Sequence, residues 1–177
     1  GYIYRGLKPV HWCPTDRTAL AESEIEYADR DDQSIFVAFP LKDDPDGVLP
    51  KSSTPTYALI WTTTPWTIPA NLALAVHPDH SYVLVEANGS RYLIGQELVE
   101  SVASVAGWSD YSLVPDFALA GSELEGLEFK HPFYERVSPV VTAGYVTFED
   151  GTGIVHTAPG HGREDFETGQ RNGLGVL

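Results

Sequence analysis

The sequence predicts an α+β fold that is predominantly β, with a barrel-like β core and flanking helices. Three observations support this prediction. Short apolar runs rich in β-branched and aromatic residues recur along the chain, and Gly, Pro, Asn and Asp separate them. The dipeptide Asn88-Gly89 joins two of these runs and is typical of a tight hairpin turn. Helical features occur in only two segments, and many short strands with few helices are typical of barrel-like folds.

The predicted strands follow one another with short connections. The first two, at residues 23–27 and 34–41, flank a polar stretch at residues 28–33 that we interpret as a hairpin loop. Residues 42–56 contain several Pro, Gly and acidic residues, so we expect an exposed loop there. The other strands are expected at residues 57–62, 73–76, 81–87, 91–94, 139–148 and 153–157.

Two helices are expected outside the strands. Leu98, Val102 and Val105 fall at the spacing of one helix face within residues 96–106, and Gly107 is placed to end that helix. Residues 163–172 form the second predicted helix. Its first turn carries acidic residues, which the positive end of the helix dipole favours, and a glycine follows its end.

Length and composition indicate one domain of a longer protein. The 177 residues are about one domain, which we divide into a connecting segment with a strand hairpin at residues 1–33 and a barrel core at residues 34–177. The chain has no methionine, not even at its first position. We therefore infer that it is a piece excised from a larger protein.

Charge and apolar pattern argue against several classes of protein. The net charge of −14 disfavours a chain that grips a phosphate backbone by itself, because that contact needs clustered Lys and Arg. The sequence has no apolar run of about 18 residues and no basic-then-apolar start, so we predict neither a membrane span nor a secretory signal. A single cysteine fits the reducing cytoplasm, where we expect the protein to reside.

The stretch WTTTPWTIPAN, at residues 61–71, is the first candidate for a functional site. It follows an apolar run that reads as a strand entering the core. Consecutive threonines on a strand place hydroxyls on both faces, although one face should be core. Pro65 and Pro69 stop regular sheet pairing. A β-rich edge is one interpretation, and irregular backbone that lines a small polar pocket is the other.

A second candidate is the stretch GTGIVHTAPGHGREDF at residues 151–166. It places His156 on a short strand, His161 between two glycines and Asp165 at the start of a helix. Each residue alone is common in a purely structural position. Together they indicate either a site that binds a small molecule or a metal-dependent hydrolase, and the second is weaker because no close pair such as His-x-x-x-His is present.

The third candidate, His11-Trp12-Cys13-Pro14-Thr15-Asp16, is half of a zinc knuckle. Asp16 stands where a second cysteine would be needed, so we interpret the segment as structural and expect no metal. Phosphate-binding loops, dinucleotide fingerprints and serine-hydrolase elbows have no match in the sequence.

Four motifs occur in order along nearly the whole chain: GLKPVHWCP at residues 6–14, TALAE at residues 18–22, WTTTPWT at residues 61–67 and GTGIVHTAPGHG at residues 151–162. Together they resemble the isoleucyl-tRNA synthetases, in the inserted editing domain of that family, which is often called connective polypeptide 1. Valyl and leucyl relatives carry Thr-Thr-Arg-Pro and an acidic residue where this chain has a third threonine, proline and tryptophan.

The resemblance implies a role for each candidate residue. In this family the Thr-rich peptide lines a hydrolytic pocket, in which Thr62, Thr63 and Thr64 would bind the terminal ribose and a water, with Thr63 the most important. Asp165 would hold the α-ammonium of the misattached amino acid and so take part in catalysis.

Other residues are expected to bind the substrate. His156 would narrow the side-chain pocket against isoleucine, and His161 would line the site. Trp66 would form a wall, and Asn71 matches a family asparagine that supports the site. The fold implied is that of class Ia synthetase editing domains.

The function implied is hydrolysis of valine from Val-tRNA(Ile), with valyl-adenylate as a further substrate. The partners would be the 3′ end of aminoacylated tRNA(Ile), the valine moiety and the remainder of the synthetase, with no cofactor. The synthetic signature motifs are absent, so aminoacylation is not expected. Two alternatives stay open: a non-catalytic β-barrel module that binds a small amino compound, and the editing domain of a valyl or leucyl relative.

Overall fold

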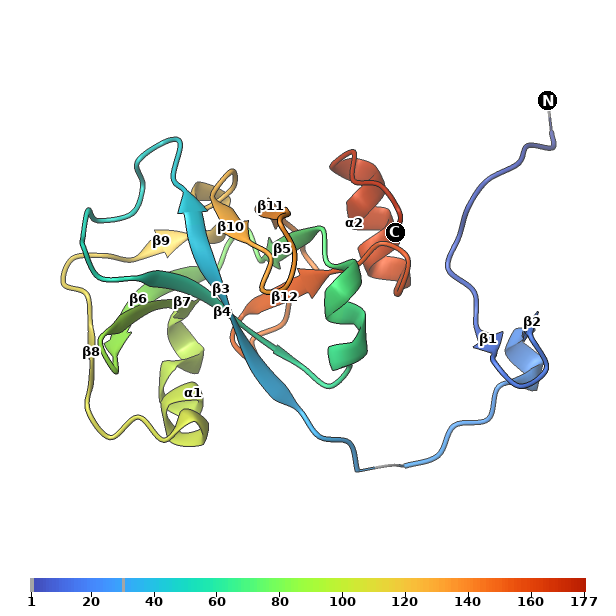
Figure 1. Ribbon diagram of the computed structural model, residues 1–177, viewed down its shortest axis with the longest axis horizontal. Helices are drawn as coiled ribbons and strands as arrows, with labels where there is room; N and C mark the ends of the chain where they lie inside the picture. The colour runs from blue at the N-terminus through green and yellow to red at the C-terminus, as the bar shows by residue number, and fades with distance from the viewer. Residues whose placement is uncertain (1, 30) are drawn as a thin grey trace.

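One mixed sheet organises most of the chain (Figure 1). The structure is a computed structural model that describes residues 2–29 and 31–177. Within those residues the sheet has ten strands, and its hydrogen-bonded order is β12-β5-β11-β10-β3-β4-β7-β6-β8, with β9 paired to β6. The strands are β3 Ile35–Asp43, β4 Thr56–Thr62, β5 Ala73–Val76, β6 Ser81–Ala87, β7 Ser90–Gly95, β8 Tyr111–Leu113, β9 Leu119–Ala120, β10 Glu128–Lys130, β11 Val137–Thr142 and β12 Ile154–Thr157.

The predominantly β prediction is confirmed, but the predicted barrel is wrong, because the sheet of the described residues does not close. Its order is an open path that ends at β12 on one side and at β8 on the other. Strands β4 and β12 lie close together, yet no ladder joins them. The chain leaves β4 after Thr62 and enters the 3₁₀ helix η2, Pro65–Ala70. Helical backbone cannot form strand-type hydrogen bonds with β12.

Apolar side chains pack on both faces of the sheet. Successive residues of β4 alternate between two clusters: Ala58 and Ile60 join the larger one, and Leu59 joins the smaller one on the opposite face. Helix α1, Val99–Ala106, covers the smaller cluster with Val99 and Val102. The sheet is therefore buried on both sides along β4, which holds the segment after Thr62 in a fixed position.

Most predicted strands and both helices are confirmed within a few residues. The turn between β6 and β7 has positive φ angles of 51° at Asn88 and 73° at Gly89. The first helix begins as the 3₁₀ turn η3, Gln96–Leu98, continues as α1 and ends at Gly107 in the left-handed conformation. The second is α2, Arg163–Arg171.

Two strand predictions are wrong. Residues 23–27 contain the end of the 3₁₀ turn η1, Glu22–Glu24, because the Glu24 carboxylate accepts a hydrogen bond from the Ala21 N–H at 2.7 Å. No strand precedes β3 there, so the predicted hairpin does not form; Arg30 of its loop lies outside the described residues. The strand expected at 139–148 ends at Thr142, where the chain turns and buries Val146 beside Ala143.

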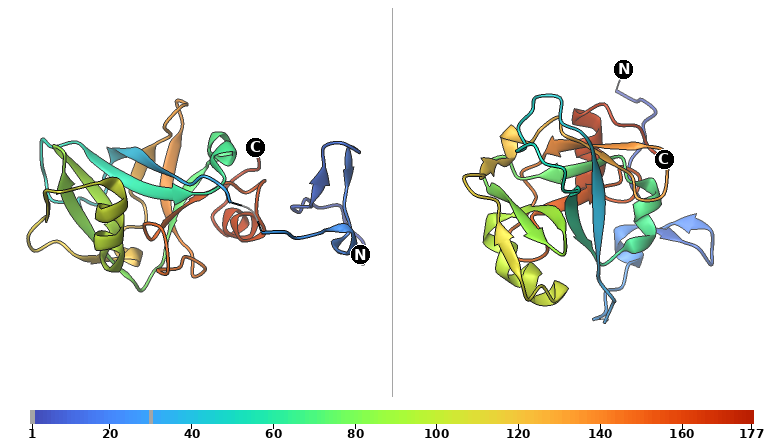
Figure 2. Two further views of the ribbon diagram at one scale, coloured as in Figure 1. Left: turned by 90° about the horizontal axis from the view of Figure 1, so that it is seen from below. Right: turned by 60° about the vertical axis from the view of Figure 1, so that its left-hand side comes forward.

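The described part of the N-terminal segment extends away from the sheet, on the side of α2 (Figures 1 and 2). Its regular structure is a two-stranded ladder of β1, Trp12–Cys13, and β2, Thr18–Ala19, followed by η1. The remaining short element, the 3₁₀ turn η4, Gly121–Glu123, lies between β9 and β10. Within residues 2–29 and 31–177, no helix has both the length and the apolar character that crossing a membrane requires.

A buried tyrosine ties the body of the sheet to the turn before β12. Tyr82 is fully buried, and its hydroxyl donates to the Gly153 carbonyl at 2.7 Å and accepts from the His77 N–H at 2.9 Å. Tyr82→Phe should therefore destabilise the fold by about 1–3 kcal/mol, because both backbone groups would lose their partner in the interior. Urea denaturation measures this loss. Tyr111→Phe on the exposed strand β8 is the control, and equal stability of the two variants would contradict the prediction.

Candidate functional site

The Thr-rich segment folds back on itself through its own hydroxyl groups. The Thr62 hydroxyl accepts from the Thr64 N–H at 3.0 Å and lies 3.2 Å from the Thr64 hydroxyl. The Thr67 hydroxyl donates to the Thr64 carbonyl at 2.8 Å. Pro65 occupies the first position of η2, where a missing N–H is no loss. The three threonines thus satisfy the backbone of the turn that leads out of β4, as the interpretation of an irregular polar segment requires.

His156 on β12 faces this segment from across the gap in the sheet. Its Nε2 lies 3.0 Å from the Thr67 hydroxyl oxygen. Since that hydroxyl uses its proton toward the Thr64 carbonyl, His156 must donate through Nε2–H and leave Nδ1 as an acceptor. His156 is only 7% exposed, and its Nδ1 is buried without a partner among the described residues.

The electrostatic state of His156 follows from this burial. Desolvation, with smaller contributions from the nearby charges of His161 and His131, lowers the pKa of His156 to about 4. The ring is therefore neutral at neutral pH.

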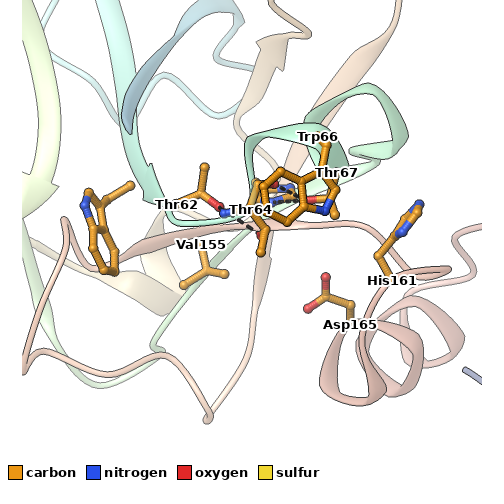
Figure 3. A pocket seen from close by; sticks show the side chains of 9 residues that line it. Thr62, Thr64, Trp66, Thr67, Val155, His161 and Asp165 are labelled. Atoms are coloured by element: carbon orange, nitrogen blue, oxygen red, sulfur yellow. Dashed lines mark hydrogen bonds between the residues drawn. The ribbon is translucent and has the colours of Figure 1, made fainter. Parts of the chain in front are cut away.

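Asp165 approaches from the third side, in the first turn of α2. Its Oδ2 accepts from the Ala158 N–H at 2.8 Å, and its Oδ1 lies 3.4 Å from the Tyr145 hydroxyl. Burial raises the pKa of this carboxyl above its usual range, and these two hydrogen bonds partly offset the effect. Asp165 and His161 lie opposite η2 with its Trp66 and Thr67 (Figure 3).

These groups surround one cavity of about 370 Å³ between β4, η2, β12 and α2. It occupies the place where β4 and β12 fail to pair, so the opening in the sheet and the polar pocket are the same feature. The structure brings six of the eight predicted site residues together here. The cavity is lined by Trp61, Thr62, Thr64, Trp66, Thr67, Val155, His156, His161 and Asp165.

Thr63 does not line this cavity. It is exposed and borders a neighbouring hollow of about 340 Å³, together with Thr147 and Asp150. Thr62 lines both hollows, whereas Thr64 lines only the cavity and Thr63 only the neighbouring hollow. The structure therefore places Thr63, the threonine expected to matter most, outside the cavity that Thr62 and Thr64 line.

Asn71, predicted to bind the substrate and support the site, is fully buried and lies outside the lining of the cavity. Its Nδ2 donates to the Ala73 carbonyl at 2.7 Å, and its Oδ1 accepts from the Ser138 hydroxyl at 2.6 Å. Asn71 thereby ties the end of η2 to β5 and β11, so it supports the cavity wall from behind.

Thr67 and Tyr145 were not predicted as site residues. Thr67 could have been identified from the sequence, because it lies three residues after Thr64 within the same hydroxyl-rich peptide. Tyr145 could not, since it belongs to a segment that we expected to be strand. Its proximity to Asp165 depends on the turn after β11.

The arrangement does not fit a metal centre. No group of three or more His, Cys, Asp or Glu side chains within the described part of the chain is placed to hold one ion. His156 Nε2 and both Asp165 oxygens already have hydrogen-bond partners. At the half-knuckle, the Cys13 thiol donates to Asp16 Oδ2 at 3.2 Å. The cavity instead combines one carboxylate with hydroxyls and a neutral imidazole, which suits a small cationic group and an ordered water.

Comparison with known proteins agrees with this fold. Residues 1–152 match the model of the family described as tRNA synthetases class I (I, L, M and V). The chain is 56% identical over 177 residues to the isoleucine–tRNA ligase of Geobacillus thermodenitrificans, covering all of this chain and 18% of that protein. It is 52% identical over 181 aligned residues to the isoleucine–tRNA ligase of Nitratidesulfovibrio vulgaris, again over all of this chain and 19% of that protein. The chain thus spans about a fifth of these relatives.

Two solved structures share the fold at low sequence identity. The crystal structure of GlLeuRS-CP1 has a TM-score of 0.64 and 18% identity, over 80% of this chain and 63% of that one. The editing domain of the cytosolic leucyl-tRNA synthetase of P. falciparum has a TM-score of 0.57 and 14% identity, over 69% and 49% of the two chains. The resemblance to isoleucyl-tRNA synthetase is confirmed, and the chain belongs to the class I tRNA synthetase family and has the fold of its editing domains.

Proposed function

We propose that this chain is a hydrolytic editing domain that removes valine from wrongly charged tRNA(Ile). The observation that carries the proposal is the cavity in which the Asp165 carboxylate faces the hydroxyls of Thr62 and Thr64. The names of its relatives, isoleucine–tRNA ligases, and the editing-domain fold support the same function. Valyl-adenylate, which carries the same α-ammonium and side chain, is a second substrate in this proposal.

Valine is the expected substrate because a synthetic site cannot reject it well. A side chain that is one methylene too small loses only about 1–3 kcal/mol of binding, a limit for which isoleucine against valine is itself the standard example. A second pocket must then sort the products by excluding the larger one. His156, which narrows the cavity from β12, is the side chain that we assign to this exclusion.

In the proposed mechanism the chain positions the ester and the attacking water. Asp165 accepts a charge-assisted hydrogen bond from the α-ammonium, which selects aminoacyl groups. The hydroxyls of Thr62 and Thr64 hold a water beside the ester carbonyl. The water oxygen bonds to the carbonyl carbon, the bond from that carbon to the ribose oxygen breaks, and the leaving ribose oxygen takes up one proton of the water to become a hydroxyl. Valine leaves as the free acid.

Positioning supplies most of the rate in this scheme. His156 cannot accept a proton through Nε2, because that atom already carries one and donates it to Thr67. An aminoacyl ester is an activated substrate, and placing a water against it in the correct orientation lowers the barrier substantially. The terminal ribose hydroxyl of the tRNA completes the set of groups around the water.

The deciding experiment follows deacylation of Val-tRNA(Ile) and Ile-tRNA(Ile) by the chain. Release of valine with the isoleucyl ester left intact supports the proposal. Binding of a valyl ester without hydrolysis would favour a non-catalytic binding module instead. Preferential hydrolysis of esters on tRNA(Val) or tRNA(Leu) would favour the editing domain of one of those relatives.

Asp165→Asn should reduce hydrolysis of the valyl ester by at least about 10-fold, because a charge-assisted hydrogen bond is worth about 1.5–3 kcal/mol. The amide keeps the size of the side chain and an acceptor for the Ala158 N–H. An ester of the matching 2-hydroxy acid, which lacks the ammonium, is the control substrate and should be affected little. Equal losses on both esters would show that Asp165 does not bind the ammonium.

The affinity for a non-hydrolysable valyl-adenosine analogue should weaken as the pH falls below neutral. The pKa of Asp165 is raised, chiefly by burial, so the carboxylate takes up a proton at a higher pH than a free aspartate and loses its charge. The same raised pKa has the opposite effect on stability, since protonation in this range removes the cost of a buried charge. Calorimetric titration across the range tests this, and Asp165→Asn should remove the carboxylate's contribution to the pH dependence.

His156→Ala should change the discrimination between the two products. Crowding by one extra methylene in a stiff pocket costs about 1–3 kcal/mol, so relieving it should raise the ratio of isoleucyl to valyl hydrolysis by about 5- to 100-fold. The ratio of the two deacylation rates is the measurement, with His11→Ala on the N-terminal segment as the control. A purely structural role predicts lower stability and equal losses on both substrates, and an unchanged ratio would exclude His156 from the size filter.

A further inference from the structure

Two aromatic rings are exposed on the loop between β10 and β11. Phe133 is 65% exposed and Tyr134 is 54% exposed. They belong to residues 131–136, which we call the aromatic loop. An isolated exposed aromatic ring is ordinary on a protein surface. The loop that carries these two rings, however, is hydrogen-bonded to η2, which forms part of the cavity wall.

His131 fixes the aromatic loop to η2. Its ring is almost fully buried, and Nδ1 accepts hydrogen bonds from the N–H groups of Phe133 and Tyr134 at 3.0 and 3.2 Å. Nε2 must then carry the proton and donate it to the Ile68 carbonyl at 2.8 Å. Burial, aided by the charge of Arg136, lowers the pKa of His131 despite the bond to Ile68, so the ring keeps this neutral form at neutral pH. The two rings are therefore presented from a rigid base.

Arg136 makes the second attachment and places a positive charge beside the rings. Its Nη2 donates to the Pro69 carbonyl, and its guanidinium carbon lies 5.3 Å from the centre of the Tyr134 ring. No carboxylate pairs with Arg136 among the residues that the structure describes. In a chain with a net charge of −14, an unpaired cation stacked on an exposed ring is uncommon.

The aromatic loop is attached to η2, the 3₁₀ helix that forms one wall of the proposed editing cavity. Its two attachments, at Ile68 and Pro69, follow Thr67, which lines the cavity. A 3₁₀ helix rises about 2 Å per residue, so the attachments lie within about 4 Å of Thr67 along η2. A cavity of about 370 Å³ takes the terminal aminoacylated nucleoside of an RNA but not the nucleotides before it. Those nucleotides must pass over the surface around the cavity.

We propose that the aromatic loop stacks a base of the single-stranded RNA segment that leads into the cavity. This inference rests on the function proposed above. Exposed rings beside a guanidinium are a sequence-tolerant platform for unpaired bases. The exposed carboxylate of Glu135 in the same loop would repel phosphates, so we assign the contact to base stacking on Phe133 and Tyr134. Remaining parts of a longer protein could occupy this surface instead, and the test separates the two.

The test compares the double variant Phe133→Ala/Tyr134→Ala on two substrates of different length. One is Val-tRNA(Ile), and the other is a valyl ester of adenosine, which lacks all preceding nucleotides. We expect kcat/KM on the tRNA to fall by about 10-fold or more, mainly through KM, because stacking on an aromatic side chain is worth about 1–3 kcal/mol per base. The short ester should be hydrolysed at the wild-type rate. Tyr111→Ala, at another exposed tyrosine, should leave both substrates unaffected.

Two other results with an active wild-type chain overturn the stacking surface. Equal losses on both esters would mean that the aromatic loop only braces the cavity wall. No loss of kcat/KM on either ester would mean that the two rings do not contact the RNA, and that another partner binds this surface. If the wild-type chain hydrolyses neither ester, the proposed function fails. Binding of a short single-stranded RNA then decides the aromatic loop separately: weaker binding by the double variant supports it, and equal binding overturns it.

Discussion

The hydroxyl of Thr67 is the single group on which the geometry of the cavity depends. It donates to the Thr64 carbonyl and accepts from Nε2 of His156, so it joins the irregular segment after β4 to strand β12. No ladder of backbone hydrogen bonds spans this gap in the sheet. A side-chain contact therefore takes the place of strand pairing, and it also sets which nitrogen of His156 carries the proton.

The surrounding fold supports that contact from several directions. Asn71 fastens the end of η2 to β5 and β11, and the aromatic loop holds the carbonyls of Ile68 and Pro69. Tyr82 fixes the turn before β12 through the Gly153 carbonyl. Buried polar groups are costly unless they are paired, and a fully paired network of such groups is rigid. These hydrogen bonds therefore make the structure around the cavity rigid. A pocket that must distinguish one methylene needs such stiffness, because a wall that yields cannot exclude a larger side chain.

The parts that sequence predicted well are those governed by local rules. Asn88-Gly89 and Gly107 adopt the positive φ angles that their turns demand, and strand β5 follows its apolar run. The barrel was wrong because closure depends on whether two distant strands pair, which no local pattern records. The motif resemblance predicted that one site contains Thr62, Thr64, His156 and Asp165. The place of Thr63 outside the cavity depends on the irregular turn after β4, and the burial of Asn71 depends on tertiary packing against Ser138.

Desolvation acts on the two titratable groups of the cavity in opposite directions, and both shifts serve one arrangement. Burial lowers the pKa of His156 to about 4 and raises that of Asp165. A charged imidazole would repel an α-ammonium and compete with it for the carboxylate. Because His156 is neutral, it can exclude the larger amino-acid side chain by size alone. The Ala158 N–H and the Tyr145 hydroxyl donate to Asp165, which favours its charged form and offsets part of the effect of burial. The cavity thus presents the carboxylate of Asp165 at one end, where it can orient a cationic substrate.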